Sequence, residues 1–399
     1  FFAIGLVIGS WMISGTIPML IVYGLKLIHP SVLYLSAFLV PVVFSTLTGT
    51  SWGSAGTVGV VVIGISAALG GDLGITAGAV VGGAYFGDKL SPLSDSTNIA
   101  ALAADVNVFE HIRSMLYTTV PSSIIACIAF TIIGFVNPPA ASSASVDTVG
   151  PFIASLESIF AFNLLLLLPP LIVLVGSLRR QPTVPVLVIS ALTASMLALL
   201  FQPFALADVL QTLYKGFDTS MAPWGTGVTE QVTTLLDRGG LFALIDAIVV
   251  AIMVFIFIGA MDHVRAIDTV VNRAFRFAKA QTTTILSTLA ASAATNALTS
   301  NQYATSFIVA DAFKAKYEAL GISRKVLSRS LEDTGTMFES LVPWHPTAVF
   351  MVATLGVPFA AYAPWQILSL TNLVIAPLFA ILGIGLFANE RASTSSTDA

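Results

Sequence analysis

Residues 87–98 read Gly-Asp-Lys-Leu-Ser-Pro-Leu-Ser-Asp-Ser-Thr-Asn, and this polar stretch separates two strongly apolar segments. Three of its residues are charged: Asp88, Lys89 and Asp95. Lipid offers no water to exposed backbone groups, so a polar break at membrane depth is tolerated only where it is buried in protein or lines a cavity. The stretch therefore predicts a binding site for a small polar solute or an ion.

The composition of the whole chain is that of a polytopic membrane protein. Of its 399 residues 56% are hydrophobic and 10% are charged, and the mean hydropathy is +0.91; about 25% of residues are charged in an average soluble domain. The net charge of −4 is spread thinly, so no nucleic-acid partner is expected. With a single cysteine, Cys127, and scattered histidines, neither a disulfide framework nor a zinc site is expected.

The chain starts inside an apolar run at Phe1, so we expect further sequence ahead of it. Along the chain, several apolar segments are shorter than the ~20 residues of a full span. These short segments occur in pairs joined by polar breaks at 48–53, 87–98, 299–303 and 332–346. Each pair is either a broken span or a re-entrant hairpin.

Basic residues decide between these two interpretations, because Lys and Arg favour the cytoplasmic side. The break at 299–303 has basic residues on both flanks: Arg265, Arg273, Arg276 and Lys279 before it, and Lys314, Lys316, Arg324, Lys325 and Arg329 after it. Both flanks are therefore expected in the cytoplasm, and residues 282–316 are predicted to form a re-entrant hairpin with its tip at 299–303. Residues 31–70 are predicted to form a second one, with its tip at 48–53.

The same order of elements (span, hairpin, broken span, span) appears twice. The first repeat covers 1–137 with a broken helix at 75–104, and the second covers 240–388 with a broken helix at 322–358. Leu47-Thr48 at one tip matches Leu298-Thr299 at the other. Connecting spans and an outer loop occupy 138–239, and a cytoplasmic tail occupies 389–399.

The first repeat starts on the inside and the second on the outside, so the repeats are predicted to be inverted. The predicted fold is thus an all-α polytopic membrane protein with inverted-topology repeats, each with a re-entrant hairpin and a discontinuous transmembrane helix. This is an architecture of secondary transporters, whose solute sites lie near the midplane where the repeats meet. The alternative is that the similarity between the halves is only compositional.

The first break carries the oxygen ligands that a hard cation such as Na⁺ prefers. They are Ser91, Ser94, Asp95, Ser96, Thr97 and Asn98, with Thr48, Thr50, Ser51 and Ser54 at the tip of the facing hairpin. Asp95 is the first choice for the essential carboxylate, because a half-buried acid can hold a proton or a cation in competition. An Asp at a helix start also suits capping. Asp88 and Lys89 fit either structural ion pairs or, for Lys89, a tethered cation that Na⁺ displaces.

The second break offers a comparable set of side chains. Asp333, Thr336, Glu339 and His345 lie in it, and Asn301 and Gln302 lie at the tip of its partner hairpin. Arg329 and Glu332 also fit a solvated cytoplasmic stretch beside the basic cluster. His345 is either a group that titrates near pH 7 or a buried structural histidine.

Several motifs resemble the NhaC family of sodium/proton antiporters over nearly the whole chain. They are Gly-Thr-Ser-Trp-Gly-Ser-Ala-Gly-Thr-Val-Gly at 49–59, Gly-Ala-Tyr-Phe followed by the polar stretch at 83–98, Phe-Glu-His-Ile at 109–112, Met-Leu-Tyr-Thr-Thr-Val-Pro at 115–121 and Leu-Glu-Asp-Thr-Gly-Thr at 331–336. The resemblance implies a Na⁺/H⁺ exchanger of the bacterial inner membrane that works by alternating access. It also implies an elevator-type homodimer, because the superfamily includes such dimers.

One departure from the family pattern concerns residues 339–345. The family is expected to read Ser-Pro-Leu-Ile-Pro-Trp-Asn there, and this chain reads Glu-Ser-Leu-Val-Pro-Trp-His. An added acid and imidazole could change the proton stoichiometry or the solute. Relatives that exchange malate and lactate with Na⁺ and H⁺ belong to the same family, so the cargo stays open.

Two functions are therefore predicted as alternatives. In the first, Asp95 and Asp333 with Glu339 bind Na⁺ or protons in turn, and Asp95→Asn is expected to stop exchange. In the second, Na⁺ and H⁺ are coupled to a small organic acid, held by His345, Lys89 and the tip amides. A channel or an enzyme fits less well, and no cofactor is expected beyond the transported ions. The lipid bilayer is the expected surrounding partner.

Overall fold

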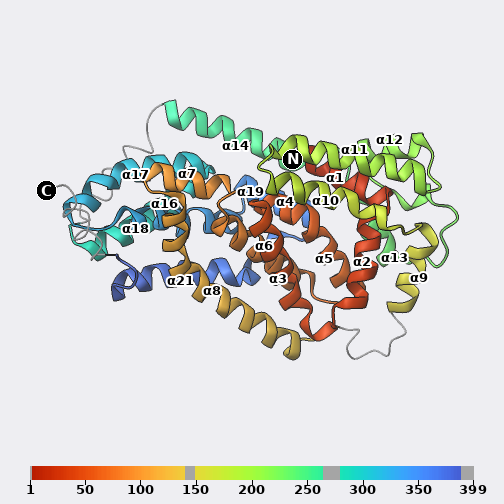
Figure 1. The fold of residues 1–399 in the computed structure, drawn as a ribbon, viewed down its shortest axis with the longest axis horizontal. Helices are drawn as coiled ribbons and strands as arrows, with labels where there is room; N and C mark the ends of the chain where they lie inside the picture. The colour runs from red at the N-terminus through yellow and green to blue at the C-terminus, as the bar shows by residue number, and fades with distance from the viewer. Residues whose placement is uncertain (1, 140–148, 264–278, 388–399) are drawn as a thin grey trace. The chain divides into compact units, whose positions relative to one another are not determined.

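The computed structural model describes residues 2–139, 149–263 and 279–387. Within these ranges the chain forms helices and turns and contains no strand. The predicted cytoplasmic tail at 389–399 and the basic residues Arg265, Arg273 and Arg276 lie outside the described residues. Figure 1 shows the course of the helices.

The described helices divide into two units, each built from three separate stretches of the chain. Unit 1 comprises Phe1–Gly87, Cys127–Val250 and Val349–Ile367, and unit 2 comprises Asp88–Ala126, Ala251–Ala348 and Leu368–Ala399. Each unit therefore takes segments from both of the repeats that the sequence predicts.

Unit 1 contains most of the amino-terminal half of the described chain. Its helices are α1 (Phe2–Ile13), α2 (Thr16–Leu27), α3 (Leu33–Thr48), α4 (Ser51–Ser54), the π-helical turn η2 (Ala55–Gly59), α5 (Val60–Ala68), the larger part of α6 (Leu73–Leu90), α9 (Val149–Ile159), α10 (Leu168–Leu178), α11 (Thr183–Phe201), α12 (Leu206–Lys215), α13 (Glu230–Leu236) and α20 (Phe359–Tyr362). α1 packs on α11, where Trp11 donates from Nε1 to Ser190 Oγ at 3.0 Å.

In unit 1 the chain turns at the tip predicted for 31–70. α3 ends at Thr48, Gly49 adopts a φ of 70°, and the Thr50 hydroxyl caps α4 by accepting from the Gly53 N–H at 3.2 Å. α6 lies against α3, and Ser45 donates from Oγ to the Gly83 carbonyl at 3.1 Å. A Cβ on Gly87 would lie 1.9 Å from Ser45 Oγ, so only glycine permits this approach.

Unit 2 is organised around three helices that pack on one another, α16 (Gln281–Thr299), α17 (Gln302–Ala319) and α18 (Arg324–Thr334). α7 (Asp95–Ala103) packs on α17 and α18, as Figure 1 shows. The remaining elements are the first part of α8 (Val108–Val136), the second part of α14 (Ile245–His263), the 3₁₀ helix η6 (Thr336–Leu341), the start of α19 (Pro346–Leu355) and nearly all of α21 (Ile367–Leu382). The core between them is formed by Leu289, Val309, Phe313 and Leu327.

Both predicted broken helices of the chain are interrupted. α6 ends at Leu90 and α7 begins at Asp95, while α18 ends at Thr334 and is followed by η6 and then α19. The predicted tip at 299–303 is a turn between α16 and α17, where Ser300 has a φ of 49° and Asn301 caps α17. That the two hairpins are re-entrant, and that the repeats are inverted, stay predictions.

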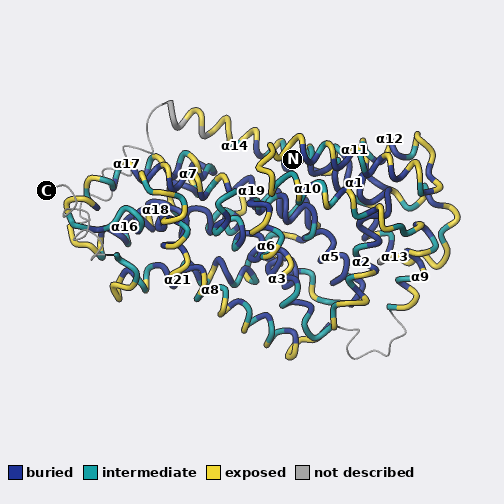
Figure 2. The backbone as a smooth tube through the Cα atoms, viewed as in Figure 1, coloured by how far each residue is buried: buried dark blue, intermediate teal, exposed yellow. Residues whose placement is uncertain are grey.

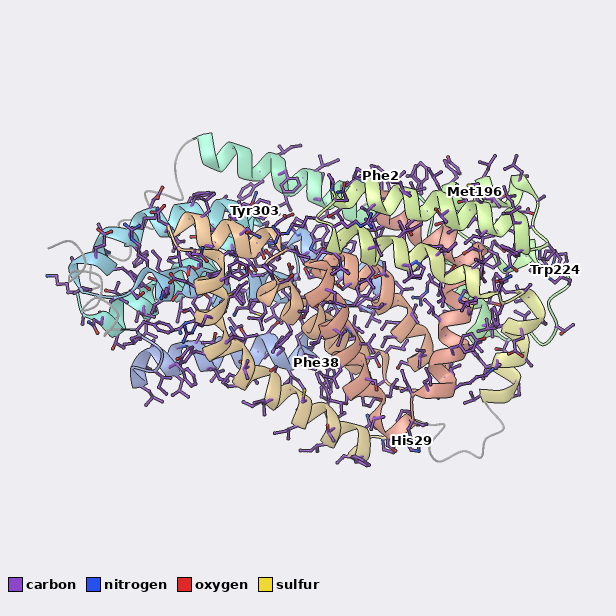
Figure 3. All side chains as sticks on the ribbon, viewed as in Figure 1. Phe2, His29, Phe38, Met196, Trp224 and Tyr303 are labelled. Carbon is purple, nitrogen blue, oxygen red and sulfur yellow. The ribbon has the colours of Figure 1, made fainter. Side chains whose placement is uncertain are left out.

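Several helices have the length and composition of membrane spans. Among the described residues, 4 helices qualify, or up to 7 when each of three helix pairs bent by 70° to 99° counts as one span. Large apolar side chains on α11 and α14 face outward: Met196 is 63% and Met253 66% exposed, and Met196 lies at the periphery in Figure 3. Figure 2 shows such exposed positions along both helices. The all-helical structure and these apolar surfaces fit a polytopic membrane protein.

Candidate ion-binding site

α18 carries three charged side chains into the interior of unit 2. Arg329 is 3% exposed, Glu332 0% and Asp333 1%, and Lys89 at the end of α6 is also fully buried beside them. Buried charges are stable only when they are paired or neutralised. We name these four residues the buried charge cluster.

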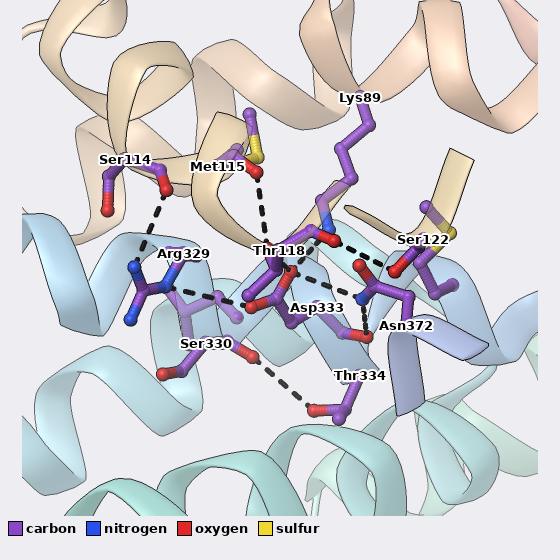
Figure 4. Close-up of polar contacts among 12 residues, drawn as sticks. Lys89, Ser114, Met115, Thr118, Ser122, Arg329, Ser330, Asp333, Thr334 and Asn372 are labelled. Atoms are coloured by element: carbon purple, nitrogen blue, oxygen red, sulfur yellow. Dashed lines mark hydrogen bonds and ion pairs between the residues drawn. The ribbon is translucent and has the colours of Figure 1, made fainter. Parts of the chain in front are cut away.

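Asp333 lies at the centre of this cluster (Figure 4). Its Oδ1 forms an ion pair with Lys89 Nζ and accepts from Thr118 Oγ1 at 2.8 Å and from Asn372 Nδ2 at 3.2 Å. Its Oδ2 lies 3.8 Å from Arg329 Nε. Two cations and two polar side chains from α6, α8, α18 and α21 thus hold one carboxylate.

Lys89 and Arg329 are fixed by the backbone around them. The Thr97 hydroxyl of α7 donates to the carbonyls of Asp88 and Lys89, both at 3.0 Å, and so holds the end of α6. Arg329 donates from its guanidinium to the Gly385 carbonyl at 3.2 Å and reaches the Ser114 carbonyl at 3.5 Å. The interpretation of Arg329 and Glu332 as a solvated cytoplasmic stretch is wrong, because both side chains are buried.

Glu332 differs from Asp333 in its surroundings. Neither of its carboxylate oxygens has a hydrogen bond among the described residues, and the Thr336 hydroxyl also has no hydrogen bond there. The groups that act on Glu332 are Thr336, Lys89, Asp88 and Asp333. A fully buried carboxylate without hydrogen-bond donors is rare, and a functional role is one explanation for it.

The polar residues of the first break mainly organise its turn. Ser94 caps α7 through the Thr97 N–H at 3.4 Å and donates to Asp88 Oδ1 at 2.6 Å. Ser91 Oγ accepts from the Leu93 N–H at 3.2 Å, and Asn98 donates to the Pro92 and Ser94 carbonyls at 2.9 and 2.6 Å. Asp95 is the first residue of α7 and is exposed. Its role as the essential carboxylate stays a prediction.

The amide side chains near the second break donate to backbone carbonyls at the end of α18. Asn296 donates to the Gly335 carbonyl at 2.8 Å and to Gln302 Oε1 at 3.0 Å, and Gln302 donates to the Leu331 carbonyl at 3.1 Å. Asn301 uses its oxygen to cap α17 at the Tyr303 and Ala304 N–H groups.

His345 completes this network. Its Nδ1 accepts from the Thr347 N–H at 3.1 Å, which leaves the proton on Nε2, 3.2 Å from Asn296 Oδ1. Because Asn296 already donates both of its protons, its oxygen is the acceptor. The tautomer follows from these partners, which are those of a neutral histidine.

One tyrosine in unit 2 is influenced electrostatically by several carboxylates. Asp88, Asp95, Glu332 and Glu339 all act electrostatically on the Tyr303 side chain at the start of α17. Asp95 is exposed, Asp88 and Glu339 are half-buried, and Glu332 is fully buried. Glu339 accepts from Thr347 Oγ1 at 3.2 Å. These carboxylates thus range from exposed to fully buried.

The two predicted ligands at the first tip, Thr50 and Ser51, belong to unit 1. Thr50 caps α4, and Ser51 is buried at the start of that helix. Sequence reasoning did not select Thr118, Asn296 and Asn372 as site residues. Asn372 is a lone amide within an apolar segment. Its polarity in that segment is the sequence signal that could have identified it as a site residue.

Comparison with known proteins identifies the family. A model described as the Na⁺/H⁺ antiporter family matches residues 83–384. An uncharacterized Na⁺/H⁺ antiporter of Haemophilus influenzae is 40% identical, over 96% of this chain and 81% of the relative. The Na⁺/H⁺ antiporter NhaC of Alkalihalophilus pseudofirmus is 36% identical, over 97% of this chain and 83% of the relative.

A third relative has a different named activity, and its alignment covers a similar share of the chain. The malate-2H⁺/Na⁺-lactate antiporter of Bacillus subtilis is 35% identical, over 96% of this chain and 80% of the relative. The resemblance drawn from the motifs is confirmed by these matches. The chain belongs to the Na⁺/H⁺ antiporter family.

Proposed function

We propose that this protein is a secondary transporter that exchanges Na⁺ for H⁺ across the bacterial inner membrane by alternating access. The observation that carries this proposal is the buried charge cluster of Lys89, Arg329, Glu332 and Asp333 in an apolar, all-helical chain of an antiporter family. Ionisable groups at membrane depth are costly, and they usually mark ion pathways and proton relays.

The carboxylates around Tyr303 supply an approach route for the cation. Asp95 and Glu339 attract Na⁺ from solution, and Asp88 passes it toward the buried charge cluster. Ser91, Ser94, Thr97 and Asn98 keep the break in shape, as their hydrogen bonds to backbone groups indicate. In unit 2, Thr336 remains a candidate hydroxyl ligand, and Asn301, Gln302 and His345 support the turn near it. In unit 1, Thr50 and Ser51 remain candidate hydroxyl ligands from the sequence.

Electrostatics couples the two ions. The cluster already contains two cations, Lys89 and Arg329, held by Asp333. An additional unit charge about 4 Å from another costs about 4 kcal/mol at an effective dielectric constant of ~20. Because 1.36 kcal/mol corresponds to one pKa unit, that energy is enough to expel a proton at constant pH. Arrival of Na⁺ therefore releases H⁺.

The architecture that we propose for the whole transporter is the one predicted from the sequence. Inverted repeats at 1–137 and 240–388, each with a re-entrant hairpin, would expose the site to each side of the membrane in turn. A homodimer in which each protomer moves by an elevator mechanism, with a cytoplasmic carboxyl terminus, completes it. The basic residues flanking the hairpins and the matched positions of the helix breaks support the inverted repeats. The homodimer and its elevator mechanism are implied by the resemblance to the family.

The test uses purified protein in liposomes with a trapped pH dye. An imposed outward Na⁺ gradient is expected to drive protons inward without any organic acid, and an equal K⁺ gradient serves as the control. Proton movement that appears only after malate or lactate is added would contradict pure cation exchange.

The second candidate, coupled exchange of a small organic acid, is favoured by the malate-2H⁺/Na⁺-lactate relative. Two groups predicted to hold its carboxylate already have partners: Lys89 pairs with Asp333, and His345 bonds to Asn296 and Thr347. Uptake of labelled malate and lactate, with and without Na⁺, separates the two functions.

A further inference from the structure

We propose that Glu332 is the carboxylate on which Na⁺ and H⁺ replace each other, while Asp333 stays paired with Lys89 and Arg329 through the cycle. The inference rests on the proposed function and assigns its chemistry to one residue. The geometry that carries it is the contrast between two neighbouring carboxylates on α18.

Asp333 is already engaged by two cations and two hydrogen-bond donors. Its Oδ1 accepts from Lys89, Thr118 and Asn372, and its Oδ2 faces Arg329. Asn372 also donates to the Asp333 backbone carbonyl at 2.9 Å, which fixes the start of the side chain. An ion that displaced these contacts would leave two buried cations without a counter-charge, which is strongly unfavourable.

Glu332 has the opposite property. Its side chain is 0% exposed, and both of its oxygens lack a hydrogen bond among the described residues. The neighbouring Thr336 hydroxyl likewise has no partner there. Burial without a hydrogen bond favours a protonated side chain here, or a carboxylate with a cation in place of the proton, because Lys89, the nearby cation, is already paired with Asp333. Glu332 and Thr336 together offer three oxygen ligands of the kind that Na⁺ binds.

The groups that face Glu332 come from several helices. Asp88 and Lys89 act on it from α6, and Asp333 acts from its own helix. Glu332 itself acts on Tyr303 of α17, together with Asp95 of α7 and Glu339 of η6. Three further carboxylates thus act electrostatically on the same tyrosine as Glu332. Asp95 is exposed, so one of these carboxylates lies at the surface of the unit.

The exchange step conserves charge. A protonated Glu332 side chain releases H⁺ and becomes a carboxylate, and one Na⁺ binds that carboxylate and the Thr336 hydroxyl. In the return step Na⁺ leaves and one H⁺ replaces it. No bond other than the carboxyl O–H forms or breaks, and no other reactant is needed.

The test compares Glu332→Gln with wild type in two liposome assays. One assay measures proton movement driven by a Na⁺ gradient, and the other measures exchange of ²²Na⁺ for unlabelled Na⁺ at constant pH. We expect Glu332→Gln to lose at least 100-fold in both assays, because its amide neither releases a proton nor neutralises Na⁺. Asp311→Asn, an acid-to-amide change at a 74% exposed side chain of α17, is the matched control and should keep both rates.

Glu332→Asp is a second variant, which keeps the assignment testable if Glu332→Gln does not fold. It keeps the carboxylate but withdraws it toward the helix, so we expect both exchanges to persist with a Na⁺ half-saturation concentration raised at least threefold. Survival of either exchange in Glu332→Gln, or an unchanged half-saturation in Glu332→Asp, would overturn the assignment. Absence of Na⁺-driven proton movement in wild type would instead contradict the proposed function.

Discussion

Glu332 and Asp333 are adjacent on α18, yet their surroundings assign them opposite roles. Asp333 has an ion pair, two hydrogen bonds and a second cation, whereas Glu332 has no hydrogen bond among the described residues. Successive residues of a helix point about 100° apart, so one of them faces Thr118 and Asn372 and the other does not. The surroundings of each carboxylate thus depend on the direction in which it points from the helix axis as much as on its residue type.

Asp333→Asn is expected to destabilise the protein by about 3–5 kcal/mol, because Lys89 and Arg329 would stay buried with no carboxylate between them. Thermal unfolding in detergent measures the loss. The double variant with Lys89→Met should recover part of it, since one of the two orphaned charges is removed. A Asp333→Asn protein that unfolds like wild type would show that the ion pair contributes nothing.

His345→Asn tests whether this histidine senses pH. The partners of His345 are those of a neutral ring, so the pH profile of exchange should keep its midpoint in the variant. Loss of the hydrogen bonds to Asn296 and Thr347 should lower stability by about 1–3 kcal/mol. Exchange rates at pH 6 to 9 decide the point, and a midpoint shift of about one pH unit or more would make His345 a titrating group.

At the scale of elements, the helix breaks are held by side chains that serve the backbone. Ser94, Thr97 and Asn98 hold the break between α6 and α7, and Asn296 and Gln302 hold the end of α18. These side chains therefore satisfy several backbone groups of the breaks without water, which is scarce in the interior of a membrane protein. Close backbone approach at glycine fixes where α6 lies against α3.

Gly87→Ala is expected to disrupt that approach. The added Cβ would lie 1.9 Å from Ser45 Oγ and 2.2 Å from the Thr46 nitrogen, which is backbone and cannot rotate away. Overpacking of this kind costs about 1–3 kcal/mol or more, and thermal unfolding in detergent measures it. Gly259→Ala is the matched control, because no atom lies within 4 Å of its added Cβ. Equal melting temperatures for the two variants would contradict the close packing.

At the scale of the whole molecule, the sequence predicted the class of protein and the positions of its breaks. Long-window hydropathy identifies apolar spans, and Gly, Pro, Ser and Asn mark the interruptions at 91–94 and 335 and the turns after Thr48 and Thr299. The resemblance to the family rested on motifs around these same places, and the family match confirmed it.

The partners within the site could not be predicted in the same way. Lys89 and Asp333 are 244 residues apart, and no local pattern pairs them. Arg329 and Glu332 lie beside the basic residues after the second hairpin, so a solvated cytoplasmic stretch also fitted them, whereas tertiary packing buries both. Asn372 was overlooked because a single amide hardly changes the hydropathy of a span.

The most direct test measures the initial rate of proton movement in liposomes without organic acids. The rate is recorded as a function of Na⁺ concentration at several pH values. If Na⁺ and H⁺ compete for one buried carboxylate, the Na⁺ concentration for half-maximal rate rises as pH falls and the maximal rate stays constant. A half-maximal Na⁺ concentration that does not change with pH would contradict exchange at a shared site.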